Sequence, residues 1–476
     1  MSVKEQHQLV DFVEQGNKPL PPPPRWLMWL AVGGTIIAVL GFAISLLVFR
    51  EVLRPGQQQR LIDAVPFMEA FLPYRPSPNA AVPTPVSNLE SAISADDLLS
   101  ISLAPTTTPS STPLQVQAIV PTQVALLTST VYPTSTPQLL PTTTPFNTVV
   151  PETTTPIVSN TILPSTAYLN GVRHVQQTWN NCGPATITIA LSYYGWVAEQ
   201  EYAASFLKPD DEDKNVSPSE MVAFVNEQTG VRALTRMGGN LDLVKTLLSS
   251  EFPVVISIGY SPEGEDWLGH YRAIVGYDDS QQVFYAYDSY LGTGEDGYGI
   301  RVTYQDIERA WQQFNYNFIV LYSQEQEEQL RTVLGEYVDP VRAAETALVT
   351  AQDQARVDPR DGFAWFNIGT ALVKLERYEE AAVAFDQARR RELPWRMLWY
   401  QFGPYEAYFN VGRYDDVIAL VNTNLINGGN YVEETYFWQG RVFAALGQTE
   451  QAAAAFRAAL RQNPLFTAAQ QALDTL

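Results

Sequence analysis

The chain has 476 residues, of which 30 are lysine or arginine and 51 are aspartate or glutamate, so its formal net charge at pH 7 is −21. Nucleic acids and anionic membrane surfaces are excluded as expected partners, because no basic patch could release their counterions. The single cysteine excludes a disulfide within the chain, so the folded parts must be stabilised by the burial of apolar side chains.

The N-terminal part contains one long apolar segment. After an N-terminal tail, residues 1–25, the uncharged residues 26–49 would span a hydrocarbon core of roughly 30 Å as a helix. Trp26 and Trp29 lie at one end, as is typical of side chains at a membrane interface. A cleaved signal peptide is the alternative, but its apolar core is normally shorter and nearer the N-terminus. The pattern predicts a single, uncleaved transmembrane helix that anchors the protein in the cell membrane.

Residues 50–167 have the composition of a linker. They are rich in proline, threonine and serine, and no charged residue occurs between Asp97 and Glu152. Such a composition cannot bury enough apolar surface to form a core, and it favours an extended, disordered stalk. Positive charge is nearly balanced on the two sides of the apolar segment, so it does not decide the orientation. Because stalks of this kind commonly hold domains away from an outer membrane face, the parts that follow are expected to be extracytoplasmic.

Residues 168–323 show the pattern of an α+β domain, with helices first and antiparallel strands later. The third helix has the start signal Ser217-Pro218-Ser219-Glu220, a serine cap followed by proline and by a glutamate that can bond back. The predicted helices cover residues 185–194, 199–207, those after Ser217, and 241–249. The predicted strands cover residues 231–235, 253–258, 271–277, 283–287 and 317–322. A peptide is expected to lie in a cleft between the helical half and the sheet half.

Cys182 is the strongest candidate for a reactive residue. It stands in the string Gln-Gln-Thr-Trp-Asn-Asn-Cys-Gly-Pro-Ala, residues 176–185, directly before the first predicted helix. Unpaired N–H groups and the helix dipole favour a thiolate at such a position. Two histidines of this domain, His174 and His270, could act as the general base. His270 is the better placed, since it opens the strand at 271–277, whereas His174 would have to swing back over a short segment to reach the thiol.

These residues resemble the papain-like cysteine peptidases, and most closely the C39-like peptidase family with its order Q…CGPA…H…GYD…D. The resemblance covers about residues 168–323 and implies a papain-like fold and hydrolysis of peptide bonds. It implies that Cys182 is the nucleophile, His270 the base, Asp288 the residue that orients the imidazole, and Gln176 a side-chain donor to the oxyanion. The chain departs from the family at one point, because Asp288 is followed by Ser289 where the family usually has proline.

Each of these assignments has a structural alternative. Cys182 could be a small buried residue and His270 a histidine that is satisfied within the core. His174 is interpreted as a structural or substrate-lining residue, and Asp278 and Asp279 are competitors of Asp288. No cofactor is expected. No metal site is expected either, because one cysteine and two histidines at these spacings do not make a tetrahedral set without carboxylates.

Residues 324–476 predict an all-α repeat region. Two units share the same internal offsets, which are typical of the tetratricopeptide repeat, and a degenerate copy lies between them around Trp399, Gly403, Tyr408 and Tyr414. Such repeats stack into a solenoid that binds protein segments, so a protein partner is expected. The alternative is that the repeats only stabilise the domain before them. The two outer units are marked by Trp365, Gly369, Leu372, Ala381, Phe385 and Ala388, and by Tyr436, Gly440, Phe443, Ala452, Phe456, Ala459 and Pro464.

The sequence as a whole predicts a membrane-anchored cysteine peptidase whose repeats recruit a protein substrate or an assembly partner. Two alternatives remain at this point. A papain-like acyltransferase would use the same thioester and pass the acyl group to an acceptor other than water. A non-catalytic scaffold would bind peptide in the cleft without cutting it.

Overall fold

The computed structural model describes residues 25–49, 61, 65–71, 81–86, 93–100 and 163–476, except residues 209, 211, 214, 262–265 and 392. The predicted tail 1–25, apart from Arg25, and most of the predicted linker 50–167 lie outside the described residues. The chain divides into two compact units, Ser102–Leu163 and the remainder, and all elements discussed below belong to the remainder.

Helix α2 (Arg25–Leu47) covers most of the segment that the sequence analysis assigned to a membrane span. Within the part of the chain that the structure describes, however, no helix combines the length and the apolar character that crossing a membrane requires. The prediction of a transmembrane helix over residues 26–49 is therefore not supported.

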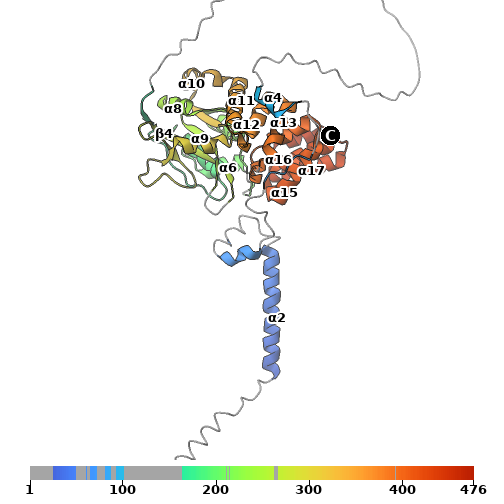
Figure 1. The fold of residues 1–476 in the computed structure, drawn as a ribbon. Helices are drawn as coiled ribbons and strands as arrows, with labels where there is room; N and C mark the ends of the chain where they lie inside the picture. The colour runs from blue at the N-terminus through green and yellow to red at the C-terminus, as the bar shows by residue number, and fades with distance from the viewer. Residues whose placement is uncertain are drawn as a thin grey trace, which may run out of the picture. The chain divides into compact units, whose positions relative to one another are not determined.

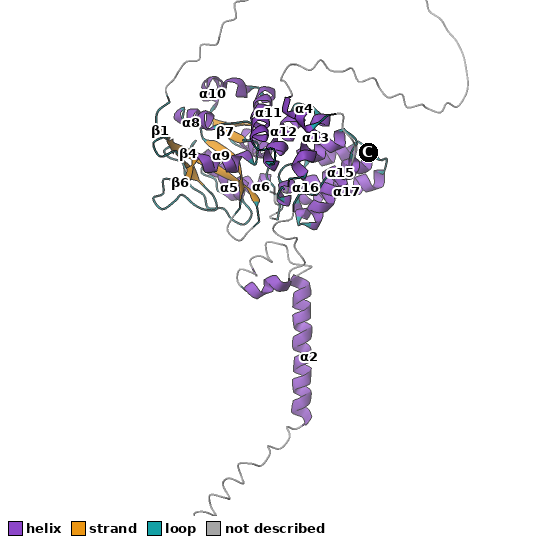
Figure 2. Cartoon of the chain, viewed as in Figure 1, coloured by secondary structure: helices purple, strands orange, loops and turns teal. Residues whose placement is uncertain are grey.

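A seven-stranded antiparallel sheet forms the centre of the α+β part (Figures 1 and 2). Its strand order is β2-β7-β3-β4-β5-β6, and β1 pairs with β4 outside this path. The strands are β1 (Thr166–Tyr168), β2 (Arg232–Arg236), β3 (Val254–Tyr260), β4 (Leu268–Asp278), β5 (Val283–Tyr287), β6 (Ile300–Thr303) and β7 (Phe318–Tyr322).

Helices cover both faces of this sheet, and each face has its own hydrophobic core. Helices α5, α6 and α7 share one core with strand residues that include Val255 and Ile319. Helices α8, α9 and α10 share the other with Val254 and Phe318. Successive side chains of a strand point to opposite faces, so neighbouring residues of β3 and β7 enter different cores. The helices are α5 (Cys182–Ser192), α6 (Gln200–Leu207), α7 (Pro218–Gln228), α8 (Leu241–Ser249), α9 (Tyr304–Gln312) and α10 (Glu327–Leu334).

The local start signal of α7 is confirmed. The Ser217 side chain accepts a hydrogen bond from the Glu220 N–H, and the Glu220 carboxylate accepts one from the Ser217 N–H. This reciprocal pair satisfies two N–H groups that the first helical turn leaves without partners. The fold class, an α+β domain followed by helices, is also confirmed, while β1, β6 and α9 were not predicted.

The region after residue 340 is helical, as predicted. It contains α11 (Pro340–Val357), α12 (Gly362–Lys374), α13 (Tyr378–Arg389), the short helix η5 (Trp395–Trp399), α14 (Gly403–Asn410), α15 (Tyr414–Ile426), α16 (Glu433–Ala445), α17 (Thr449–Gln462) and α18 (Thr467–Asp474). Helix α10, which the sequence analysis placed with this region, instead packs Leu330 and Leu334 into a core of the sheet.

Equivalent glycines let the paired helices approach closely. A Cβ atom at Gly369 of α12 would lie 2.7 Å from a ring atom of Phe385 in α13, and one at Gly440 of α16 would lie 2.5 Å from the ring of Phe456 in α17. Both contacts are shorter than carbon atoms tolerate, so a larger residue at either position requires the ring to move. The two outer repeats are therefore built by the same packing.

The helical region is joined to the α+β part by direct contacts. Asn367 of α12 donates a hydrogen bond to the Gln312 carbonyl over 2.7 Å, and Asn215 donates to the Glu434 carboxylate over 3.0 Å. Trp267, next to β4, belongs to the same hydrophobic core as α12 and α13. The two regions thus share buried side chains as well as polar contacts.

Two short pieces of the predicted linker also pack on the helical region. Val82 is buried and donates its N–H to the Leu393 carbonyl over 2.8 Å. Arg389 donates to the carbonyls of Pro83 and Thr84. The second piece, helix α4 (Ala95–Ser100), buries Leu98 in the same core. Within residues 50–167, these described pieces are therefore folded rather than part of a stalk.

Candidate active site

Cys182 is the first residue of α5, three residues before the predicted start of that helix. The chain that leads to it is held against α6. Asn181 is buried and donates from Nδ2 to Gln200 Oε1 over 2.7 Å, and Gln200 donates back from Nε2 to the Gln176 carbonyl over 2.8 Å. The half-buried thiol is thus presented at a helix N-terminus by a fixed backbone.

His270 lies in β4 and is 4% exposed. Its Nε2 atom is 2.9 Å from Asp288 Oδ1, which leaves Nδ1 as the ring nitrogen that faces Cys182. Burial acts to lower the pKa of His270, but hydrogen bonds with Asp288 and Cys182 outweigh it and raise the pKa to about 9. The imidazole is therefore held in its protonated form at neutral pH.

Asp288 follows β5 directly, and its side chain is fully buried. Oδ1 also accepts the backbone N–H groups of Tyr290 and Leu291, over 2.9 and 3.0 Å, and Oδ2 accepts Arg272 Nε over 2.8 Å. Burial alone would raise the pKa of the Asp288 carboxyl, but the His270 hydrogen bond and the charges of His270 and Arg272 lower it overall. The group stays ionised and is fixed in one orientation.

Arg272 was not predicted as part of the site, although the sequence carries a signal for it. It stands two residues after His270 in the same strand, so both side chains point to the same side of the sheet. Its guanidinium is 10% exposed and bonds the carboxylate oxygen that His270 leaves unused. Arg272 thus fixes Asp288 through its second carboxylate oxygen.

The remaining sequence candidates do not bond the side chains of Cys182, His270 or Asp288. Gln176 is exposed and donates from Nε2 to the Tyr290 carbonyl over 2.9 Å, so its role as an oxyanion donor stays a prediction. His174 bonds the main-chain oxygen of Asp288 over 2.8 Å, which matches its interpretation as a structural residue. The Asp278 carboxylate accepts the Ser280 N–H in the hairpin turn. The Asp279 carboxylate accepts hydrogen bonds from Tyr304 and Lys245.

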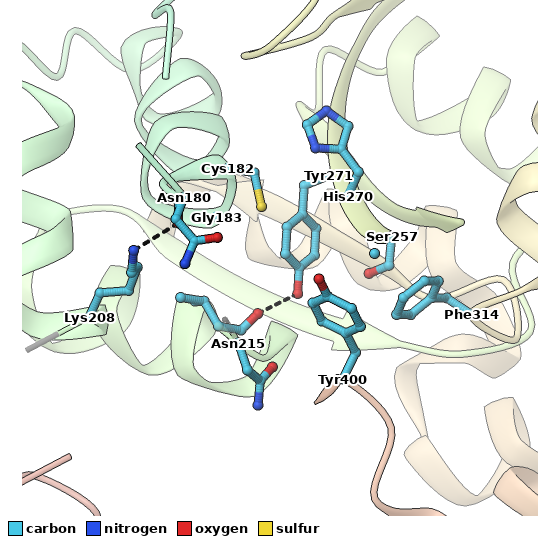
Figure 3. Close-up of a pocket in the computed structure, with 12 residues that line it drawn as sticks. Asn180, Cys182, Gly183, Lys208, Asn215, Ser257, His270, Tyr271, Phe314 and Tyr400 are labelled. Atoms are coloured by element: carbon cyan, nitrogen blue, oxygen red, sulfur yellow. Dashed lines mark hydrogen bonds between the residues drawn. The ribbon is translucent and has the colours of Figure 1, made fainter. Parts of the chain in front are cut away.

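Cys182 and His270 line one pocket (Figure 3), which contains residues from the helical half, from the sheet and from the repeat region. In Figure 3 the Cys182 sulfur points into this pocket, and the His270 ring lies on the sheet side. The Tyr271 ring lies between Cys182 and Tyr400. The lining residues are Asn180, Cys182, Gly183, Lys208, Asn215, Val216, Ser257, Gly269, His270, Tyr271, Phe314 and Tyr400. The contributions of Lys208, Asn215 and Tyr400 were not predicted from the sequence.

Comparisons with known proteins agree with this architecture. Residues 169–319 match the model of the peptidase C39-like family, and residues 364–388 and 434–465 match models of the tetratricopeptide repeat. The degenerate middle copy, which the structure forms as α14 and α15, lies between the two matched repeats. A comparison with curated proteins found no match.

Three solved structures are similar to part of this chain. A putative C39-like peptidase from Bacillus anthracis has 15% identity and a TM-score of 0.27, and the similarity covers 33% of this chain and 98% of that one. The peptidase domain of Streptococcus ComA, a bifunctional ABC transporter involved in quorum sensing, has 15% identity and a TM-score of 0.26 over 32% of this chain and 99% of that one. A double glycine motif protease from an AMS/PCAT transporter, in complex with the leader peptide, has 15% identity and a TM-score of 0.25. The similarity covers 33% of this chain and 99% of that one.

The family match and the repeat matches fall on the regions that the structure builds as an antiparallel sheet with covering helices and as paired helices. Residues 169–319 of this chain are a C39-like peptidase domain, and it is followed by tetratricopeptide repeats between residues 364 and 465.

Proposed function

We propose that the protein is a cysteine peptidase in which Cys182 is the nucleophile, His270 the acid and base, and Asp288 the residue that orients the imidazole. The observation that carries the proposal is the buried contact of 2.9 Å between His270 Nε2 and Asp288 Oδ1, behind a pocket that His270 shares with Cys182. This is the geometry that thiol activation requires, a nucleophile beside a base that a third group holds in place.

In the first step, the Cys182 thiolate attacks the carbonyl carbon of the scissile peptide bond, and the carbonyl electron pair moves to the oxygen. The N–H groups of the first turn of α5 point toward the developing negative charge and stabilise it. The His270 imidazolium gives its proton to the leaving amine. The C–N bond then breaks, and a thioester with Cys182 remains.

In the second step, neutral His270 takes a proton from water, and the resulting hydroxide attacks the thioester carbon. Collapse of this intermediate breaks the C–S bond, releases the carboxylic acid and leaves the Cys182 thiolate beside protonated His270. Asp288 stabilises the imidazolium each time it forms, and Arg272 holds Asp288 in position. Neither Asp288 nor Arg272 touches the substrate in this scheme.

The single cysteine provides a direct test, because any thiol label on the protein reports Cys182. We expect iodoacetamide at pH 7 to label the wild-type protein, and His270→Ala to lower the labelling rate and to lower peptide hydrolysis by about 100-fold or more. Cys182→Ala should abolish both. His174→Gln is the matched control, since the His174 ring bonds the main-chain oxygen of Asp288 and not its carboxylate. Equal labelling rates in His270→Ala and wild type would refute the nucleophile–base pair and favour the scaffold alternative.

We further propose that the repeats bind a segment of a protein substrate or partner, since that is what stacked repeats of this kind usually do. The proposed location outside the cytoplasm rests on the composition of residues 50–167 alone. Protease added to intact cells should then remove the folded part. Full protection of residues 163–476 would contradict that location.

A further inference from the structure

One side chain of the repeat region lines the pocket that contains Cys182. Tyr400 follows the short helix η5, yet it forms part of the same pocket wall as Gly269 and His270 of β4. Figure 3 shows the Tyr400 side chain entering the pocket from its own loop, with the hydroxyl end toward Tyr271. The pocket is thus built by both regions of the protein.

The position of the Tyr400 ring depends on a glycine. A Cβ atom on Gly269 would lie 3.1 Å from two ring atoms of Tyr400 and 2.8 Å from the ring of Phe314. Because Gly269 has no side chain, the two aromatic rings pack directly against the backbone of β4, next to His270. The Tyr400 ring centre is 6.2 Å from that of Phe314 and 6.0 Å from that of Trp267.

Polar contacts hold the chain on both sides of Tyr400. Before it, Arg396 Nη2 lies 3.2 Å from Asp266 Oδ2, and both side chains are mostly buried. After it, Gln401 donates from Nε2 to the Gln313 carbonyl over 3.0 Å. Both partners belong to the peptidase domain, so the loop that carries Tyr400 is fixed relative to Cys182 at two points.

We propose that Tyr400 is a specificity-determining residue, which limits the size of the groups that can reach the Cys182 sulfur. The proposal rests on the peptidase function proposed above. The repeat region would then be part of the substrate site as well as a place for a partner. A substrate with a bulky side chain beside the scissile bond would meet the Tyr400 ring, and removal of the ring would admit it.

The test compares two reagents of the same chemistry and different size, iodoacetamide and N-benzyl iodoacetamide, on the full-length protein. The measured quantity is the ratio of the two rates at which Cys182 is labelled. We expect Tyr400→Ala to raise the relative rate of the benzyl reagent about tenfold, because the ring no longer overlaps with the benzyl group. Tyr400→Phe keeps the wall and loses only the hydroxyl, so its ratio should equal that of the wild type.

Tyr378→Ala is the matched control, since Tyr378 is a tyrosine of helix α13 that does not line the pocket. Its ratio should not change. If Tyr400→Ala fails to fold, Tyr400→Leu keeps apolar contact with Phe314 and should raise the ratio by a smaller factor. An unchanged ratio in a folded Tyr400 variant overturns the proposal. Failure of both reagents to label Cys182 in the wild type overturns the peptidase function itself.

Discussion

The Asp288 carboxylate connects the chemistry of the site to the stability of the fold. It accepts hydrogen bonds from His270, Arg272 and the backbone N–H groups of Tyr290 and Leu291. Its side chain is fully buried, so loss of any of these donors leaves negative charge less well satisfied in a region of low dielectric. Changes at this group should therefore affect both reactivity and the free energy of unfolding.

The first prediction concerns pH. The pKa of His270 is about 9 in the folded protein and about 6.5 when exposed, so its contribution to stability is complete below pH 6.5 and is lost as the pH rises through 9. As the pH rises from about 6.5 to above 9, we expect the free energy of unfolding of the wild type to fall by roughly 3 kcal/mol relative to that of His270→Gln. Urea unfolding at pH 6, 7.5 and 9.5 measures the difference.

The Asp288 contribution has the opposite sign. Its pKa is lowered in the folded protein, so its stabilisation is present above the unfolded pKa and is lost as the pH falls through the folded value. The paired contribution should therefore be greatest between about pH 4 and 6.5. If the free energy of unfolding changed with pH in the same way for wild type and His270→Gln between pH 6.5 and 9.5, His270 would not be protonated as described.

The second prediction concerns Arg272. Arg272→Met removes one partner of a buried ion pair and leaves Asp288 with three donors, so we expect the free energy of unfolding to fall by about 3 kcal/mol. Arg301→Met is the matched control, because the Arg301–Asp296 pair is also short, at 2.7 Å, but the two side chains are 56% and 42% exposed. That change should cost less than about 1 kcal/mol. Equal losses in the two variants would mean that Arg272 does not stabilise Asp288.

Among the elements, β4 is the longest strand and does most to assemble the site. It pairs with β3 and β5. Its residues Gly269 and His270 line the pocket, and Arg272 bonds the Asp288 carboxylate. Its central position in the sheet gives the imidazole a rigid support. The predicted strand begins at Tyr271, three residues after the first residue of β4 in the structure. The residues left out are at the end of the strand that forms the site.

The third prediction tests the close packing within a repeat. Gly440→Ala puts a methyl group 2.5 Å from the Phe456 ring, and such overpacking typically costs about 1–3 kcal/mol. The expected result is a lower thermal midpoint, even though alanine favours the helix. The double variant Gly440→Ala, Phe456→Leu provides the control. If the clash is the cause, the two changes should be less than additive, whereas additive losses would exclude it.

For the whole molecule, the peptidase domain, the repeats and two pieces of the expected linker form one connected body. Trp267 and Leu98 lie in the same core as α12 and α13, and Asn215 reaches Glu434 of α16. Deletion of the repeats would therefore uncover apolar side chains next to the site. Point changes at the contacts are the more informative experiments.

The fourth prediction concerns residues 81–86. Val82 is 3% exposed and Val86 is 54% exposed, although both belong to the same extended piece. Val82→Ser should weaken its attachment and increase cleavage within this piece by a broad-specificity protease about tenfold, because proteolysis follows the opening equilibrium. Val86→Ser, the control, should leave the cleavage rate near that of the wild type. No acceleration in Val82→Ser would show that the piece is held by other contacts.

The sequence by itself determined the local chemistry of this protein. Cys182 at a helix start, the cap at Ser217 and the spaced glycines and aromatic residues of the repeats are readable because each depends on neighbours within a few residues or on a repeating interval. Helix α9 could have been found in the same way, since Thr303 caps it and Ile307 and Trp311 are one turn apart on its buried face.

Only the tertiary structure decided which distant residues meet. Arg272 reaches Asp288, Tyr400 enters the pocket of the peptidase domain, and Val82 packs on the repeats because strand pairing and helix packing bring separate parts of the chain together. Spacing along the chain can give the face to which a side chain points, as for Arg272, but not the distant residue that it meets. That depends on the register of the sheet and on shapes that complement each other across the core. Gln176, to which the family resemblance assigned the oxyanion, bonds the Tyr290 carbonyl in this structure, and its catalytic role stays a prediction.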